Sequence, residues 1–302
     1  MKIRKFSEDI LSDTAKLCRL SMELDIMPDF LLREKTFGEQ DYDPELTLTA
    51  FEDESHVPIA FIQGVIKDRF GEKIGYIKLL CVNPNFRHLG TATSLYKNIE
   101  DQMRKKGVGK IRVYESYPNY FMPGVDPFYT EAVCFFEKNG FKKFGDTSNL
   151  TADLSLVNFD TQEEENKLKL QNIICRRAEK KDFPGIMKWI DEDFNAWISE
   201  VNESFNNDPV SLFIAEQNGV IGAFSAFEVN NKGTGWFGPM GTANSLRGKG
   251  IGGILFKKCL ADMKNIGYSK AIIPWVGPIP FYMKYANSKV SRIFWRYEKT
   301  LD

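Results

Sequence analysis

Two stretches of the chain combine arginine and glycine with a following helical pattern, and either could hold an anion. The more glycine-rich one, residues 246–253, reads Leu-Arg-Gly-Lys-Gly-Ile-Gly-Gly. It follows an apolar run punctuated by glycine and precedes residues 254–263, where apolar residues recur at helical spacing. A glycine-rich turn between a strand and a helix presents backbone N–H groups at the positive end of the helix, which is a site for a phosphate. Arg247 adds a planar donor that is always charged.

A similar stretch occurs earlier in the chain. Residues 76–82 have the pattern of a strand, and a helical pattern begins at Ala92. The spacing Arg-x-x-Gly-x-Gly/Ala is therefore found at residues 87–92 and again at 247–252, which lie 160 residues apart in a chain of 302. A repeat at about half the chain length indicates two copies of one domain.

The order of elements around each turn predicts a mixed α/β fold. In each half a strand and helices precede several antiparallel strands, and the turn, its helix and further strands follow. We expect a mostly antiparallel central sheet flanked by helices, with domains at residues 1–156 and 173–302. The polar residues 157–172 would form a linker, in which a helical turn is possible. Residues 33–44 are expected to form a loop or a poorly defined helix, and residues 141–144 and 150–156 two separate strands.

Composition excludes several classes of protein. The formal net charge is −1, so no overall basic field would hold nucleic acid or an anionic membrane. No apolar run is long enough to span a bilayer, and charged residues interrupt the N-terminus from Lys2 onward. The five cysteines are scattered without C-x-x-C spacing, and the two histidines lack neighbouring ligands. We expect a cytoplasmic protein with reduced thiols and no metal.

This order of elements, with its two Arg-x-x-Gly-x-Gly/Ala turns, resembles the GNAT superfamily of acetyl-CoA-dependent N-acetyltransferases. The tandem arrangement is similar to that of the mycothiol-synthase-like group. In that family the turn binds the pyrophosphate of coenzyme A, and the preceding strand splays from its neighbour to pair with the pantetheine arm. The resemblance implies two tandem GNAT-like domains and acetyl-CoA as co-substrate.

The same resemblance implies which residues contact the cofactor. In the second half they are Gly241, Thr242, Arg247, Gly248, Lys249, Gly250, Ile251 and Gly252. In the first half they are Cys81, Val82, Arg87, His88, Leu89, Gly90, Thr91 and Ala92.

A tyrosine in a Phe-Tyr-x-x-x-Gly-Phe-like helix serves as general acid to the departing thiolate in such domains. Tyr282 takes that place in the second half, where Asn287 stands for the usual glycine. In the first half the position is Phe136, which has no proton to donate. We therefore expect the C-terminal domain to carry the chemistry, although water could also protonate a thiolate in the N-terminal domain.

The base that deprotonates the amine is less clear. Glu228, near the end of a predicted strand, is the nearest carboxylate in the second half, and Glu115 holds a comparable place in the first. Two alternatives stay open: an ordered water that relays the proton, and a plain surface position for either glutamate.

Other interpretations of these motifs were weighed. Gly248-x-Gly250-x-x-Gly253 also fits the dinucleotide fingerprint, but too few βα units follow it and the first copy lacks it. A P-loop is excluded because Gly250 stands where serine or threonine should follow Lys249. The aromatic loop 117–127 could line an acceptor pocket or cap the sheet.

The sequence thus predicts transfer of an acetyl group from acetyl-CoA to a primary amine by direct attack in a ternary complex. Strand amides near Gly241 and Thr242 would polarise the thioester carbonyl. The alternative is a non-catalytic acyl-CoA-binding or sensing protein on the same fold. The acceptor, a small amine, amino acid, aminoglycoside or peptide, is not specified, and neither is the choice between monomer and homodimer.

Overall fold

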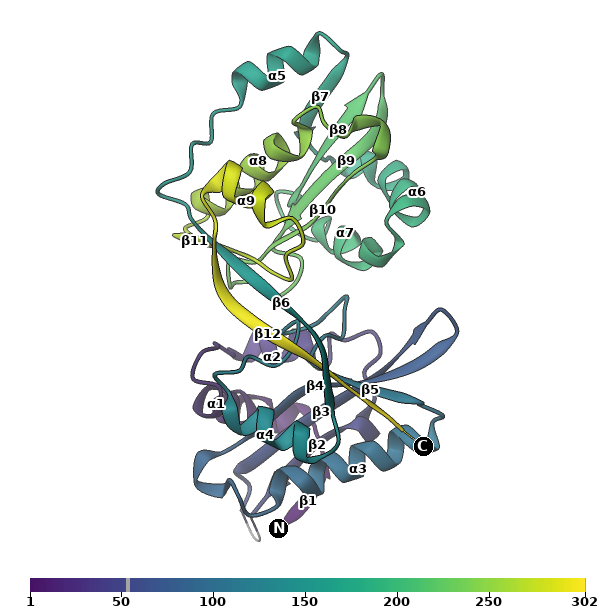
Figure 1. The fold of residues 1–302 in the computed structure, drawn as a ribbon, viewed down its shortest axis with the longest axis vertical. Coiled ribbons are helices and arrows are strands. Elements are labelled where there is room, and N and C mark those ends of the chain that lie inside the picture. The colour runs from purple at the N-terminus through teal and green to yellow at the C-terminus, as the bar shows by residue number, and fades with distance from the viewer. Residues whose placement is uncertain (53–54, 302) are drawn as a thin grey trace. The chain divides into compact units, whose positions relative to one another are not determined.

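A computed structural model describes residues 1–52 and 55–301 (Figure 1). The chain divides into two compact units: Met1–Thr147 with the segment from Ile293 onward, and Ser148–Arg292. We call them the N-terminal unit and the C-terminal unit. This division differs from the expected ranges, because the last strand belongs largely to the N-terminal unit and residues 148–172 belong to the C-terminal unit.

The N-terminal unit is built on a sheet with strand order β1-β2-β3-β4-β5, continued by β12 beside β5. The β4–β5 pair is parallel, and the other pairs are antiparallel. Its elements in chain order are β1 (Lys2–Lys5), α1 (Leu11–Ser21), α2 (Asp29–Lys35), β2 (Thr47–Phe51), β3 (Pro58–Arg69), β4 (Glu72–Val82), α3 (Thr91–Lys105), β5 (Lys110–Val113) and α4 (Thr130–Lys138). The strands β6 (Lys142–Asp153) and β12 (Lys289–Thr300) each contribute residues to both units.

Helix α3 packs closely on this sheet because its apolar residues recur one turn apart. Leu95, Ile99 and Met103 are all buried. A side chain at Gly64 of β3 or Gly75 of β4 would come within 3 Å of Met103, so glycine is what lets the helix approach the strands. This contact fixes the turn that precedes α3 relative to the end of β4.

The C-terminal unit has a four-stranded antiparallel sheet of order β10-β9-β8-β7, and β11 pairs with the end of β6. Its elements are α5 (Gln162–Lys169), β7 (Ile173–Arg177), α6 (Phe183–Asp193), α7 (Ile198–Ser204), β8 (Leu212–Gln217), β9 (Val220–Phe227), β10 (Phe237–Thr242), α8 (Ile251–Asn265), β11 (Lys270–Ile273) and α9 (Ile279–Ala286).

Alternate residues of β8 enter different cores, as the period of a strand requires. Phe213 and Ala215 join the core that contains α8, whereas Leu212 and Ile214 join the core beneath α6 and α7. Helices therefore cover both faces of this sheet.

Three expectations about local structure are corrected. The expected linker 157–172 contains α5, whose Leu168 is buried in the core of the C-terminal unit. Residues 33–44, expected as a loop or a poorly defined helix, begin with the last turn of α2, which is held by the buried Leu31 and Leu32. The two expected strands around residue 147 are the single strand β6. The expected fold class, a mixed α/β chain with mostly antiparallel sheets flanked by helices, is confirmed. In the described residues no helix is both long and apolar enough to cross a membrane.

Candidate functional site

The two glycine-containing turns have the same backbone conformation. Gly90 and Gly250 both have φ of 82° and immediately precede α3 and α8. Two residues earlier, His88 and Gly248 also have positive φ, at 62° and 79°. The left-handed conformation is natural for glycine and uncommon for histidine. The two units therefore share the same turn, and in the N-terminal unit it contains one residue in a strained conformation, His88.

Open space lies in front of these turns. A Cβ atom added to Gly90, Gly248 or Gly250 would meet nothing within 4 Å. These glycines therefore leave the backbone uncovered by side chains at the positive end of a 15-residue helix in each unit. This is the geometry in which a helix start binds phosphate.

The expected cofactor residues lie together in each unit. In the C-terminal unit they comprise the end of β10 (Gly241, Thr242), the turn (Arg247, Gly248, Lys249, Gly250) and the start of α8 (Ile251, Gly252). In the N-terminal unit they comprise the end of β4 (Cys81, Val82), the turn (Arg87, His88, Leu89, Gly90) and the start of α3 (Thr91, Ala92). Their contact with coenzyme A stays a prediction.

The arginine of each turn has a role that the sequence did not indicate. The Nε atom of Arg247 donates to the carbonyl oxygen of Thr242 at 3.1 Å, and that of Arg87 donates to Val82 at 3.4 Å. Each arginine therefore ties its turn to the end of the preceding strand. Arg87 also contacts the Ser21 carbonyl at 3.2 Å and Glu131 at 3.5 Å, whereas the guanidinium of Arg247 is exposed.

In both units the strand before the turn separates from its parallel neighbour. Pairing of β4 with β5 runs from Ile74 to Ile77, and the N–H of Tyr114 then donates to the Ile77 carbonyl at 2.8 Å. Beyond that point β4 continues to Val82 while β5 has ended. In the C-terminal unit a single parallel bridge joins Trp236 to Ile272, and β10 continues as an edge strand. We call these two gaps the splays.

A β-bulge marks both strands near the separation. The register shifts between Gln63 and Gly64 where β3 meets β4, and between Phe237 and Met240 where β10 meets β9. A strand that leaves its neighbour exposes unpaired N–H and C=O groups, which suit an extended, amide-bearing ligand.

Tyr282 lies at the splay of the C-terminal unit. Its ring packs edge-to-face on Phe237 of β10 and Phe256 of α8, at centroid distances of 6.3 and 5.3 Å. The side chain is 8% exposed, and burial raises its pKa to about 12. Its hydroxyl makes no hydrogen bond within residues 1–52 and 55–301. Asn287 ends α9 with φ of 48°, the left-handed conformation that a glycine would otherwise supply.

At the corresponding place in the N-terminal unit, Phe136 is fully buried and carries no hydroxyl. Its ring packs edge-to-face on Tyr114 at a centroid distance of 5.9 Å.

Glu228 is anchored in the turn between β9 and β10. Its carboxylate accepts a hydrogen bond from the Gly233 N–H at 2.7 Å. Burial raises its pKa, and its Oε1 atom is buried without a partner among the described residues. These contacts explain Glu228 as an anchor of the turn, and its role as a base stays a prediction.

Glu115 is held by two arginines. Arg296 donates to it from Nε at 2.5 Å and from Nη2 at 2.9 Å, and Arg112 donates at 3.2 Å. A carboxylate whose oxygens are both paired with guanidinium groups is a poor base, so the contacts favour a structural role.

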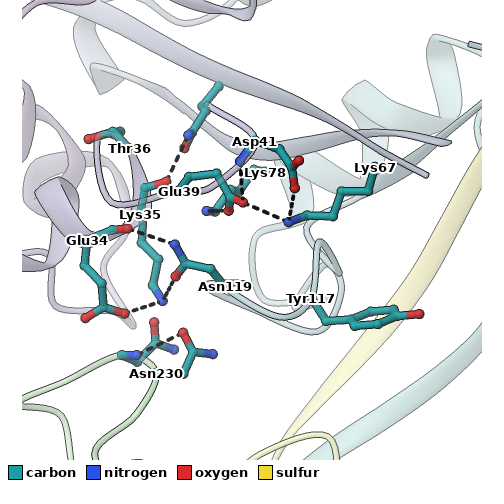
Figure 2. Close-up of polar contacts among 12 residues, drawn as sticks. Glu34, Lys35, Thr36, Glu39, Asp41, Lys67, Lys78, Tyr117, Asn119 and Asn230 are labelled. Carbon is teal, nitrogen blue, oxygen red and sulfur yellow. Dashed lines mark hydrogen bonds and ion pairs between the residues drawn. The ribbon is translucent and has the colours of Figure 1, made fainter. Parts of the chain in front are cut away.

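The sequence did not reveal a buried charge cluster beside the bulge of β4. Figure 2 shows Glu39 between the ammonium groups of Lys67 and Lys78, with Asp41 also on Lys67 at 3.0 Å. The side chain of Lys78 is fully buried and that of Glu39 is 1% exposed. Burial would raise the pKa of Glu39, but the two lysines outweigh it and lower that pKa. Burial lowers the pKa of Lys78 to about 7, against the opposing attraction of Glu39.

The aromatic loop 117–127 packs into the core of the N-terminal unit rather than standing open. Phe121, Met122 and Val125 are buried there. Cys81, at the end of β4, is also buried, with its sulfur 3.5 Å from that of Cys18. Both observations favour packing roles for these residues.

Comparisons with known proteins agree with this geometry. The model of the acetyltransferase (GNAT) family matches residues 16–141 and 174–284, one segment in each unit and together well over half of the chain. No curated protein sequence matches.

Among solved structures, the chain is similar to the GCN5-related glucosamine N-acetyltransferase region of a fungal multi-domain GH3 β-N-acetylglucosaminidase. The TM-score is 0.82 at 19% identity, over 99% of this chain and 38% of that one, so the chain spans well under half of the fungal protein. It is also similar to a GCN5-related N-acetyltransferase from Sphaerobacter thermophilus (TM-score 0.69, 16% identity, 99% and 95% covered). A tandem GNAT protein from the clavulanic acid biosynthesis pathway matches with a TM-score of 0.69 at 13% identity, over 99% and 98% of the two chains.

The family model matches one segment in each unit, and a tandem GNAT protein is among the similar structures, so the chain has a tandem GNAT arrangement. The chain belongs to the GNAT acetyltransferase family, with one family segment in each half.

Proposed function

We propose that this chain transfers an acetyl group from acetyl-CoA to a primary amine, and that the C-terminal unit carries the chemistry. The observation that supports this most directly is Tyr282. It is a buried phenol without a hydrogen-bond partner in the described chain, at the splay between β10 and β11. Its ring is packed in place while its hydroxyl has no partner in the described chain and is not fully shielded from solvent, so the hydroxyl is suited to donate to a ligand group.

In the proposed binding mode, successive parts of acetyl-CoA, from the pyrophosphate to the thioester, contact different elements of the C-terminal unit. The amides of residues 248–252 hold the pyrophosphate, with the exposed guanidinium of Arg247 beside it. The free edge of β10 pairs with the pantetheine arm, and amides near Gly241 and Thr242 polarise the thioester carbonyl. In the N-terminal unit, the end of β4 and residues 87–92 offer the same arrangement with a more fully engaged arginine.

The proposed reaction is a direct attack. The neutral amine adds to the carbonyl carbon, the carbon–sulfur bond breaks, and Tyr282 donates its proton to the departing thiolate. The proton of the amine goes to a base, either Glu228 through a water molecule or water alone. Glu228→Gln separates these cases, because it removes the base while its oxygen can still accept from the Gly233 amide.

The acceptor is best sought first among amino sugars. The similar fungal region is described as a glucosamine N-acetyltransferase, and this chain aligns with it over nearly its whole length. We therefore place glucosamine first in a panel that also contains polyamines, amino acids, aminoglycosides and peptides.

The test measures release of coenzyme A across this panel, with acetyl-CoA binding measured by calorimetry. We expect turnover with at least one amine. We expect Tyr282→Phe to lower kcat by at least about tenfold, because general acid catalysis contributes about 10²–10⁴-fold. Binding of acetyl-CoA without turnover on any amine would instead support a non-catalytic acyl-CoA-binding protein.

A further inference from the structure

The buried tyrosines of this chain fall into two groups. Most have a hydrogen-bond partner: the Tyr96 hydroxyl donates to Glu100 at 3.0 Å, and that of Tyr297 donates to Glu137 at 2.7 Å. Tyr282 and Tyr114 differ, since neither hydroxyl has a hydrogen-bond partner anywhere in the described chain. Each of these two lies at the splay of its own unit.

The backbone places Tyr114 where the two strands of the N-terminal unit separate. Its N–H forms the last hydrogen bond between β4 and the β5 segment, to the Ile77 carbonyl at 2.8 Å. Its φ of 66° is unusual for an aromatic residue, and such strain is found where function requires a particular placement. In the C-terminal unit Trp275, two residues after β11, has φ of 45°, so an aromatic residue with positive φ follows the corresponding strand there as well, one position further along.

The side chain of Tyr114 lies beside the position that lacks a proton donor. Its ring packs edge-to-face on Phe136, and only 5% of the residue is exposed. Its surroundings include Cys81 of β4 and Asp25, whose carboxylate accepts from the Tyr129 hydroxyl at 2.6 Å. Each unit therefore has one phenol at its splay: Tyr282 on α9 in the C-terminal unit, and Tyr114 after β5 in the N-terminal unit.

A packing role alone does not explain the hydroxyl of Tyr114. The hydroxyl has no hydrogen-bond partner among the described residues and is not fully shielded from solvent, so phenylalanine could pack the same ring but could not donate a proton from this position. Its burial, with the added effects of Cys81 and Asp25, raises its pKa and keeps it protonated as a donor.

We propose that Tyr114 is the proton donor of a second acetyl-transfer site in the N-terminal unit, in place of the hydroxyl that Phe136 lacks. This inference rests on the proposed function for its cofactor. The amine nitrogen bonds to the carbonyl carbon and loses its proton to water. The carbon–sulfur bond breaks, its electron pair stays on sulfur, and the thiolate takes the phenolic proton of Tyr114. Water then reprotonates the phenolate.

The kinetic test compares the wild type, Tyr282→Phe, Tyr114→Phe and the double variant, with the best amine of the panel. We expect Tyr282→Phe to retain a residual rate, and we expect adding Tyr114→Phe to lower that rate at least about tenfold. Tyr96→Phe is the matched control: it removes a buried hydroxyl from the same unit, away from the splay, and should leave the rates unchanged.

The binding test uses coenzyme A and desulfo-coenzyme A in calorimetry. We expect the wild type to bind two molecules of coenzyme A. Tyr114→Phe should lower the affinity at one of the two sites by about 3- to 10-fold, the effect of one hydrogen bond, and should not change the affinity for desulfo-coenzyme A. Its melting temperature should stay the same or rise, since no hydrogen bond within the protein is lost.

Three results would overturn the proposal. The first is a Tyr282→Phe protein with no residual turnover, and the second is a residual rate that Tyr114→Phe does not change. The third is tighter coenzyme A binding by Tyr114→Ala, which would mean that the Tyr114 side chain blocks the splay. A wild type that releases no coenzyme A with any amine would instead contradict the proposed function itself.

Discussion

Single residues distinguish two units that share one backbone plan. Arg87 and Arg247 make the same strand-end hydrogen bond, yet Arg87 has further partners and Arg247 is exposed. The bulge of β4 carries the buried Lys78, whereas the bulge of β10 contains Gly238. These differences between matching positions give the N-terminal unit buried charged side chains at its bulge, where the C-terminal unit has glycine on the same backbone plan.

Lys78 should make stability depend on pH. Its pKa is about 7 in the folded chain and near 10.5 when unfolded, so the unfolded state binds more protons between these values. The free energy of unfolding should therefore rise from pH 7 toward pH 10, by at most about 1.4 kcal/mol per pH unit from this group. Lys78→Met should flatten that rise, as measured by urea unfolding at a series of pH values. An equally steep rise in the variant would contradict the assignment.

At the scale of elements, the turns before α3 and α8 depend on glycine for conformation rather than for space. Gly250→Ala adds a Cβ atom that meets nothing, but it places alanine at φ of 82°. We expect a loss of about 1–2 kcal/mol in stability and weaker acetyl-CoA binding. Thermal unfolding and calorimetry measure both effects.

Gly185→Ala is the matched control for this prediction. Gly185 lies in α6, also has open space at its Cβ position, and has an ordinary φ. Alanine there should stabilise the chain by about 0.5–1 kcal/mol. If Gly250→Ala and Gly185→Ala changed stability and acetyl-CoA binding in the same way, the positive φ at Gly250 would not explain the effect of its substitution.

The sequence predicted elements well where a repeating local pattern determines them. The apolar spacing after Gly250 predicted α8, and the repeated Arg-x-x-Gly spacing predicted a second turn of the same shape. It could not predict contacts made between distant segments. Glu39 meets Lys78 only because the segment after α2 lies over the bulge of β4, and the residue type of Tyr114 gives no sign of its positive φ.

At the scale of the whole molecule, the last residues of the chain, from Ile293 onward, belong to the N-terminal unit. The final strand had been assigned to the C-terminal domain because it follows α9 in sequence. In the structure, residues 298–300 of β12 pair with β5, and Arg296 holds Glu115 with two hydrogen bonds. Tyr297 and Lys299 add contacts to Glu137 and Glu100. The N-terminal unit is therefore incomplete without the last residues of the chain.

This arrangement predicts that a change near the C-terminus destabilises the N-terminal unit. Arg296→Met leaves Glu115, which is 2% exposed, with Arg112 as its remaining partner, and we expect a loss of about 3–5 kcal/mol. Hydrogen exchange should rise in β4 and β5, whereas β8 and β9 should keep their protection.

Lys289→Met is the matched control, on the exposed start of β12 within the C-terminal unit. It should leave hydrogen exchange unchanged in both units. The double variant Glu115→Gln/Arg296→Met should recover part of the loss, because it removes a buried charge that has lost two of its three hydrogen bonds to arginine. If exchange rose first in β8 and β9 of the Arg296→Met protein, β12 would belong to the C-terminal unit, as its place in the sequence had suggested.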